Sequence, residues 1–324
     1  MAKQDLVIGI DVGGQSTKLG VVDARGNILY QSVISSLQRE LEEYINDITA
    51  AINDLVAQCK EDGNVKGIGI GAPNGNYYKG TIEFAPNLKW AYDSNGNPMV
   101  IQFAKLISDR VNIPVVLTND ANAAAVGEMT YGIAKGMKNF IMITLGTGVG
   151  SGIVINGNIV YGHDAFAGEL GHTTIIRDGR PCGCGLKGCL ETYTSATGVA
   201  RTAKEFLQRD NTPSLLRNLD IEKISSKDIY DAAKQGDKLA LEIFEYTADI
   251  MGKAFANFVA FSAPEAIVLF GGLTKAKEFL TENIEKSMNE NMLKMWKGKV
   301  KLLYSTLKDS DAAILGASAL GWEV

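Results

Sequence analysis

Three cysteines, Cys182, Cys184 and Cys189, lie within eight residues of one another, and glycines separate them. This spacing is typical of a metal site rather than of a disulfide framework, because closely spaced thiolates can converge on one ion. Four-coordinate zinc needs one more ligand, and the chain has only two histidines. We favour His172, ten residues before Cys182, over His163. A redox pair or a set of buried free thiols is the alternative.

A zinc ion with four protein ligands has no open position, so we expect a structural ion that does not activate water. Its role would be to fix the two neighbouring carboxylates, Glu169 and Glu191. Cys59 stands apart from the cluster, on the apolar face of a predicted helix, and we interpret it as a core residue.

A glycine-rich turn follows the first strand-like segment. Glycine lets backbone N–H groups approach phosphate oxygens without a side-chain clash, which Gly13 and Gly14 would allow here. Asp11 is suited to hold Mg²⁺ directly or through water, and Lys18 could supply a point charge for phosphate. Taken alone, this turn could also be no more than a tight hairpin.

A second turn of the same kind offers hydroxyl and amide donors from Thr144, Gly146, Thr147 and Gly148. Neither turn matches the Walker signature or the Gly-x-Gly-x-x-Gly dinucleotide fingerprint. The pattern therefore argues against a P-loop enzyme and against a Rossmann dehydrogenase.

Asp120 lies where a predicted strand, residues 115–118, ends and a helix of small residues, 121–130, begins. The helix dipole favours an ionised carboxylate at this position. In phosphoryl transfer to an alcohol, such a carboxylate orients the hydroxyl and accepts its proton. Aspartate is also a common helix cap, so capping alone would explain the residue.

The elements that must position these residues follow from turns and apolar spacing. Residues 6–30 predict three strands separated by a glycine turn and a tight turn, and residues 140–161 repeat this order about 130 residues later. We interpret the repeat as a duplicated unit rather than a solenoid. Two similar hairpins facing one cleft could grip one polyphosphate.

Apolar residues from Leu37 to Cys59 follow the spacing of one helical face. The stretch from Gly71 to Pro98 has few periodic signals. Further strands are expected at 65–70, 115–118, 266–270 and 300–304, and further helices at 99–110, 121–130, 197–208, 226–235, 238–263, 279–291 and 312–320.

Length and composition predict two packed lobes of the α/β class, because 324 residues with 46% hydrophobic content exceed the size at which one core keeps growing. We expect a smaller lobe from residues 1–118 plus about 306–324 and a larger lobe, 119–305, with the zinc site. The active site would lie in the cleft between them.

The formal net charge of −5 does not suit a protein that neutralises phosphate backbones, so nucleic acid is not an expected partner. The chain has no apolar stretch of the length that a signal peptide or membrane helix requires, so we expect a cytoplasmic protein with no membrane partner.

Together these residues resemble the ROK family of sugar kinases and related repressors, within the actin/hexokinase-like ATPase superfamily. The resemblance spans essentially the whole chain. Its most specific parts are Gly168-Glu-Leu-Gly-His172 and Cys182-Gly-Cys-Gly-Leu-Lys-Gly-Cys-Leu-Glu191, which match the sugar and zinc signature of the family. The resemblance implies a two-lobed actin-like ATPase fold, related to ribonuclease H.

The resemblance also implies roles on the sugar side. Asn119 and Asp120 would bind sugar hydroxyls, with Asp120 as the general base. The ring hydroxyls would contact Glu169, Glu191 and His172, which would serve both zinc and sugar. Two further residues, Gly71 and Asn87, belong to family loops at the sugar side.

On the nucleotide side, the resemblance implies that the segments from Asp11 to Lys18 and from Gly146 to Gly150 bind the phosphates of ATP, with Mg²⁺. Gly271 and Gly272 would lie against the adenosine. In the first loop Gln15 replaces the usual threonine, so its hydroxyl contact must be lost or supplied by Ser16 or Thr17. The loop after Gly71 also departs from the family pattern, which affects the sugar fit.

Among kinases of the family, the segment from Glu191 to Gly198 looks most like a glucokinase, so we expect phosphorylation of the 6-hydroxyl of glucose. Kinases for N-acetylmannosamine, N-acetylglucosamine, mannose and fructose share the same motifs. A transcriptional repressor is disfavoured, because only ten residues precede Asp11, where repressors carry a DNA-binding domain. The resemblance further implies self-association as a dimer or tetramer.

Overall fold

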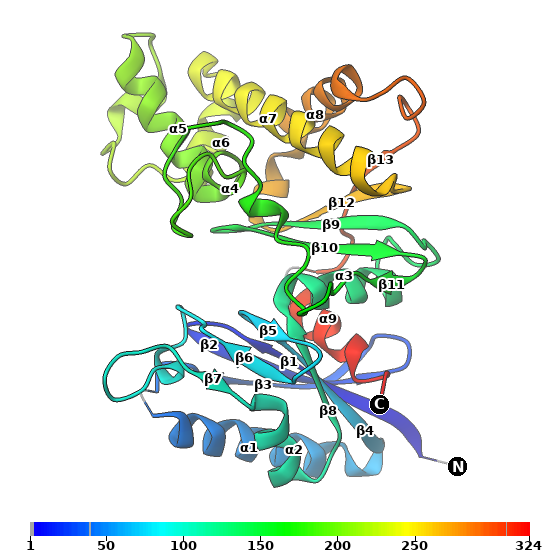
Figure 1. The fold of residues 1–324 in the computed structure, drawn as a ribbon. Coiled ribbons are helices and arrows are strands. Elements are labelled where there is room, and N and C mark those ends of the chain that lie inside the picture. Colours follow the sequence, from blue (N-terminus) through cyan, green and yellow to red (C-terminus); the bar gives the residue numbers. More distant parts are fainter. Residues whose placement is uncertain (1–2, 39, 309) are drawn as a thin grey trace. The chain divides into compact units, whose positions relative to one another are not determined.

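The computed structural model describes residues 3–38, 40–308 and 310–324. The chain forms two compact units, and each contains strands of a β-sheet (Figure 1). The first unit takes the chain up to Met137 together with Asn158–Gly168 and Thr306–Val324. The second unit takes Lys138–Gly157 and Glu169–Ser305.

The sheet of the first unit has the strand order β3-β2-β1-β4-β8. The first three strands form the expected antiparallel meander, while β4 pairs parallel to β1 and β8 pairs parallel to β4. The bounds of its strands are β1 (Gln4–Val12), β2 (Ser16–Asp23), β3 (Ile28–Ser35), β4 (Gly63–Ala72) and β8 (Val115–Asn119).

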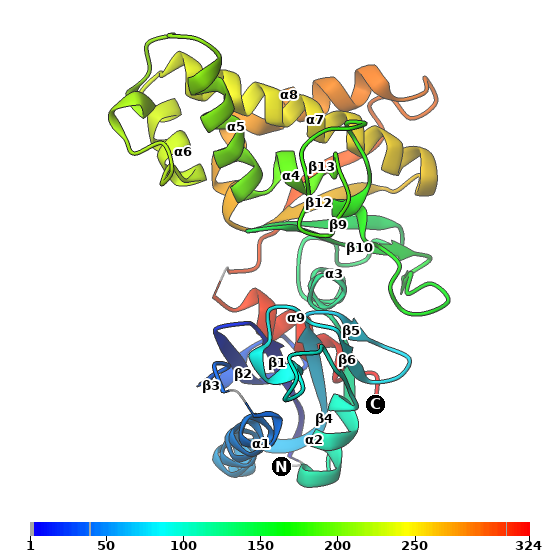
Figure 2. The ribbon, with the colours of Figure 1, turned by 60° about the vertical axis from the view of Figure 1, so that its left-hand side comes forward.

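Alternate residues of β1 face opposite sides of this sheet, as the period of a strand requires. Leu6, Ile8 and Ile10 pack in the core cluster that also holds the apolar faces of α1 (Leu41–Gln58) and α2 (Phe103–Val111). The opposite face carries α9 (Ala312–Leu320) and α3 (Asp120–Thr130), so helices cover both faces (Figure 2).

Glycines let α9 approach the backbone of the first sheet closely. A Cβ atom on Gly9 would lie 2.1 Å from the Ile314 carbonyl oxygen, and one on Gly69 would lie 1.9 Å from that of Ala317. A Cβ atom on Gly127 of α3 would lie 2.6 Å from the Gly316 Cα of α9. This close packing places residues 119–137 with the first unit, although the sequence suggested a boundary after residue 118.

The stretch with few periodic signals contains two strands of a small three-stranded sheet, in the order β5-β6-β7. The third strand, β7, lies where the sequence predicted the start of a helix, which instead begins at Phe103. The short strands of this sheet depend on pairing across the sheet rather than on local propensity, which explains why the sequence pattern did not reveal them. They are β5 (Gly75–Asn76), β6 (Thr81–Glu83) and β7 (Val100–Ile101), and the first unit also includes β11 (Asn158–Ile159).

In the second unit, β10 pairs antiparallel to β9, and β12 and β13 continue this sheet in parallel. The β9–β10 hairpin repeats the β1–β2 hairpin, which confirms the predicted duplication. The bounds of these strands are β9 (Phe140–Leu145), β10 (Val149–Ile155), β12 (Ala266–Phe270) and β13 (Lys301–Tyr304).

The second unit contains five α-helices within the described residues. Helices α7 and α8 pack against each other, and α7 also contacts α4, α5 and α6 (Figure 1). Their bounds are α4 (Glu191–Thr194), α5 (Ala196–Arg209), α6 (Ser226–Lys234), α7 (Lys238–Ser262) and α8 (Lys277–Asn291). None of the helices among the described residues combines the length and apolar character that a membrane span requires.

Candidate active site and metal centre

Three neighbouring strands of the first sheet end beside one another. Asp11 of β1 pairs with Gly71 of β4, and Ala72 pairs with Asn119 of β8, so the carboxyl ends of these parallel strands share one edge. A Cβ atom on Gly71 would lie 3.6 Å from the Cα atom of Asp120. The edge therefore brings together Asp11, Gly71, Asn119 and Asp120, which the sequence analysis assigned to two sides of one site.

Asp11 is only partly exposed and lies near a second carboxylate. Burial and, to a smaller extent, the negative charge of Asp120 raise its pKa to about 6, while the positive charge of Lys18 acts in the opposite direction. Lys18 stands opposite Asp11 in the register of β1 and β2. A carboxylate in this environment gains from a cation, which is the property that a Mg²⁺ ligand needs.

Asp120 is the first residue of α3, directly after the N-cap residue Asn119. The Ala121 N–H donates to Oδ1 of Asn119 at 2.8 Å and to Oδ1 of Asp120 at 2.7 Å. Desolvation by the surrounding protein raises the pKa of Asp120, although the residue keeps solvent exposure, and the Ala121 N–H acts in the opposite direction. Asn119 is therefore the cap, and the Asp120 carboxylate accepts from the neutral Ala121 N–H.

The first glycine turn lies against the loop that carries Asn87. A Cβ atom on Gly14 would lie 2.8 Å from the Asn87 carbonyl oxygen, so only glycine permits this approach. Gly13 N–H donates to the Ser16 carbonyl oxygen at 3.1 Å and closes the turn.

The structure separates the two hydroxyls that could replace the missing threonine of this turn. Thr17 is fully buried, and its hydroxyl bonds to Ser36 Oγ at 2.8 Å and to Tyr44 Oη at 2.5 Å. Its side chain therefore anchors the turn in the core. Ser16 is partly exposed and is the hydroxyl left at the turn.

The second glycine turn is closed by its own backbone and side chains. Gly146 N–H donates to the Gly148 carbonyl oxygen at 3.0 Å, and Gly150 N–H donates to Thr144 Oγ1 at 3.1 Å. Gly146 and Thr147 are exposed at its tip. Glu191 Oε2 accepts from the Val149 N–H at 2.9 Å, so this carboxylate lies on the turn.

A pocket of about 460 Å³ opens beside this turn. Gly271, at the end of β12, has a φ of 109°, and a Cβ atom there would lie 2.6 Å from the Leu145 carbonyl oxygen. Only glycine fits this position, and it brings Gly272 to the same pocket as Gly146 and Thr147.

One wall of the pocket comes from α6, whose residues the sequence analysis missed. The residues of α6 that line the pocket are Ser226, Lys227, Tyr230 and Asp231. The helix itself was predicted and begins at a capping box formed by Ser225 and Asp228. Its position beside Gly272 depends on packing between distant segments, which no local pattern reports.

The four predicted zinc ligands converge. The ligand atoms of His172, Cys182, Cys184 and Cys189 all lie within 4.8 Å of one another, with Cys182 Sγ 3.6 Å from His172 Nδ1 and Cys184 Sγ 3.7 Å from Cys189 Sγ. Such separations suit thiolates around one tetrahedral zinc ion. His163 is exposed in the first unit and is not part of this cluster.

Glu169 precedes the short 3₁₀ helix that presents His172, and its carbonyl oxygen accepts the His172 N–H at 3.1 Å. A Cβ atom on Gly171 would lie 2.1 Å from the Val149 carbonyl oxygen, so this segment packs directly on β10. The residue Glu191 links the cluster to the glycine turn, because its Oε1 lies 3.7 Å from Cys182 Sγ.

Comparisons with known proteins agree with these findings. Residues 7–323 match the sequence model described as the ROK family. A protein named glucokinase from Halalkalibacterium halodurans is 36% identical over 98% of this chain and 94% of its own length. A ROK family glucokinase structure from Streptomyces griseus, in complex with glucose and AMPPNP, is 34% identical, with a TM-score of 0.77 over 98% of this chain and 100% of its own.

Repressors form a more distant group of relatives. A xylose repressor from Caldicellulosiruptor bescii is 28% identical over 97% of this chain and 77% of its own length.

Proposed function

Because this chain belongs to the ROK family, we propose that it is an ATP-dependent glucokinase that phosphorylates the 6-hydroxyl of glucose. It has the two-lobed actin-like ATPase fold of the α/β class. The observation that carries the proposal is the shared strand edge, where Asp120 lies beside Asp11. Asp120 would orient the hydroxyl of the sugar that accepts the phosphoryl group, and Asp11 would bind the Mg²⁺ ion of the nucleotide.

On the sugar side, Asp120 would orient the attacking hydroxyl and accept its proton. A raised pKa supports this role, because a more basic carboxylate is a better proton acceptor. The remaining sugar hydroxyls would be bound by Asn87, Asn119, Glu169, His172 and Glu191, with Gly71 leaving room beside Asp120.

On the nucleotide side, the pocket lined by Gly146, Thr147 and Gly272 is the candidate site for adenosine. The phosphates would be bound by backbone N–H groups of both glycine turns, with Lys18 and Ser16 at the first turn. Asp11 would hold Mg²⁺, which neutralises charge on the phosphates. The reaction would proceed by direct in-line transfer without a phospho-enzyme.

The cluster of His172, Cys182, Cys184 and Cys189 would hold a structural zinc ion. Its donor set leaves no open position, so the ion would supply rigidity to the segment that carries Glu169 and Glu191. Self-association as a dimer or tetramer stays a prediction from the family resemblance, and a cytoplasmic location stays a prediction from the sequence.

The choice of sugar is tested by comparing kcat/KM for glucose, mannose, fructose, N-acetylglucosamine and N-acetylmannosamine with ATP and Mg²⁺. We expect glucose to have the highest value. A higher value for an N-acetylhexosamine would replace glucokinase by the corresponding kinase, because one unmatched hydroxyl contact can produce large discrimination. No ADP formation with any of these sugars would overturn the proposal of a kinase.

A further inference from the structure

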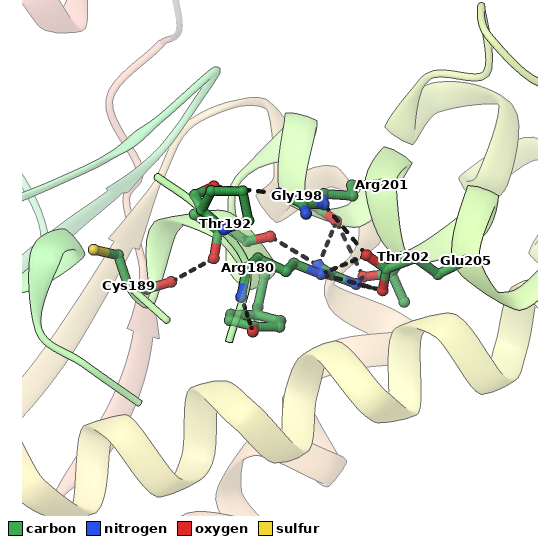
Figure 3. A network of polar contacts seen from close by, with 9 residues as sticks. Arg180, Cys189, Thr192, Gly198, Arg201, Thr202 and Glu205 are labelled. Carbon is green, nitrogen blue, oxygen red and sulfur yellow. Dashed lines mark hydrogen bonds and ion pairs between the residues drawn. The ribbon is translucent and has the colours of Figure 1, made fainter. Parts of the chain in front are cut away.

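A buried arginine lies at the start of the cysteine loop, which we define as residues 180–189. The side chain of Arg180 is only 5% exposed, and each of its guanidinium N–H groups has an acceptor in α4 or α5 (Figure 3). The acceptors are the Thr192 carbonyl oxygen at 2.8 Å, the Gly198 carbonyl oxygen at 3.2 Å, Thr202 Oγ1 at 2.9 Å and the Glu205 carboxylate, 3.0 Å from Nε.

The backbone of Arg180 joins the two arms of the cysteine loop. Its carbonyl oxygen accepts the Gly188 N–H at 2.8 Å, and its N–H donates to Tyr193 Oη at 2.9 Å. The guanidinium also lies over the Tyr193 ring, 4.4 Å from its centre. Since Cys182 is two residues away on one arm and Cys189 adjoins the other, both ligands depend on this anchor.

Arg180 forms hydrogen bonds to the junction between α4 and α5, and this junction also forms hydrogen bonds to the second glycine turn. Ala196 N–H donates to the Gly146 carbonyl oxygen at 2.9 Å, and Thr197 Oγ1 donates to the Thr147 carbonyl oxygen at 2.8 Å. One rigid junction therefore bonds to the cysteine loop on one side and to the tip of the glycine turn on the other.

We propose that Arg180 is a positioning residue that holds the cysteine loop and the second glycine turn in one fixed arrangement through the α4–α5 junction. The inference rests on the proposed function, in which the loop serves the sugar and the turn serves the nucleotide. Arginine suits the role because its planar group makes five directed hydrogen bonds, while lysine offers only three donors. Loss of a hydrogen-bond partner would leave the buried guanidinium charge uncompensated, which is strongly destabilising, so the hydrogen bonds of Arg180 are expected to be kept together.

The test compares Arg180→Met and Arg180→Lys with the unchanged chain. For Arg180→Met we expect KM for glucose and KM for ATP to rise together, and zinc to be released faster to a chelator, with an affinity for zinc about 10- to 100-fold lower. Arg180→Lys should lie between the two. A residue that only stabilises the fold would lower the melting temperature and the active fraction while both KM values and the release rate stayed unchanged.

Arg209→Met is the matched control. Arg209 lies on the same helix α5, but its guanidinium bonds to Asp210 and Glu242, outside the cysteine loop and the glycine turn. We expect it to keep both KM values and the zinc release rate.

If Arg180→Met does not fold, Glu205→Gln provides the second test, because this side chain is 46% exposed and its loss weakens the same anchor. It should produce a smaller change in the same direction. Unchanged KM values and zinc release in every folded Arg180 or Glu205 variant would overturn the proposal. Zinc release and melting are measured without sugar, so they test Arg180 even if the unchanged chain phosphorylates no glucose.

Discussion

The chemistry at the edge of the first sheet depends on two carboxylates with different surroundings. Asp11 is partly buried beside Asp120, and the combination raises the pKa of Asp11 to about 6. Asp120 and the N-cap residue Asn119 both accept the Ala121 N–H. The sequence identified both residues, but the pKa of Asp11 reflects neighbours that only the fold brings together.

Replacing Asp11 by Asn should stabilise the protein at neutral pH. Because its folded pKa is raised from 3.8 to about 6, the folded state binds the proton more tightly, and the native chain loses stability as pH rises between these values. In Mg²⁺-free buffer, the melting temperature of Asp11→Asn relative to the native chain should therefore increase from pH 4 to above pH 6. Asp54→Asn, on the exposed face of α1, should show no such trend. A constant or shrinking difference for Asp11→Asn would contradict the assignment.

His172→Ala should release zinc and weaken glucose binding together, because one side chain would serve the ion and the sugar. Zinc content by elemental analysis and KM for glucose measure the two effects. His163→Ala is the control, since this exposed histidine lies outside the cluster and should retain zinc and affinity. One zinc ion per chain in His172→Ala would remove this residue from the ligand set.

The elements that position the site depend on close contacts at glycines. Gly9 of β1 and Gly69 of β4 bring α9 onto the sheet whose edge carries the carboxylates, and Gly271 brings β12 to the second turn. Long periodic helices such as α7 and both hairpins were predictable from local patterns. The short strands β5, β6 and β7 and the position of α6 were not, because they depend on partners distant in sequence.

Gly69→Ala should destabilise the first unit by about 1–3 kcal/mol, since the added methyl group would meet the Ala317 carbonyl oxygen of α9. Chemical denaturation measures this change. Gly183→Ala, where nothing lies within 4 Å of the added atom, should leave stability almost unchanged. Equal stability of the two variants would mean that α9 does not pack on the sheet so closely.

For the whole molecule, membership of the ROK family and the repeated hairpins support one function, the transfer of a phosphoryl group from ATP to glucose. The sequence motifs predicted the residue types of the site. They could not predict the hydrogen bonds of Arg180 or the position of α6 beside the pocket. Both depend on contacts between segments distant in sequence, which produce no recognisable residue spacing.

The most direct measurement follows glucose 6-phosphate formation by the native chain and by Asp120→Asn, alongside glucose affinity. We expect ADP and glucose 6-phosphate in equal amounts from the native chain. In Asp120→Asn, kcat should fall by about 10²- to 10⁴-fold while glucose affinity changes much less, because the lost group acts on the proton. Normal turnover by Asp120→Asn would contradict the role of this carboxylate.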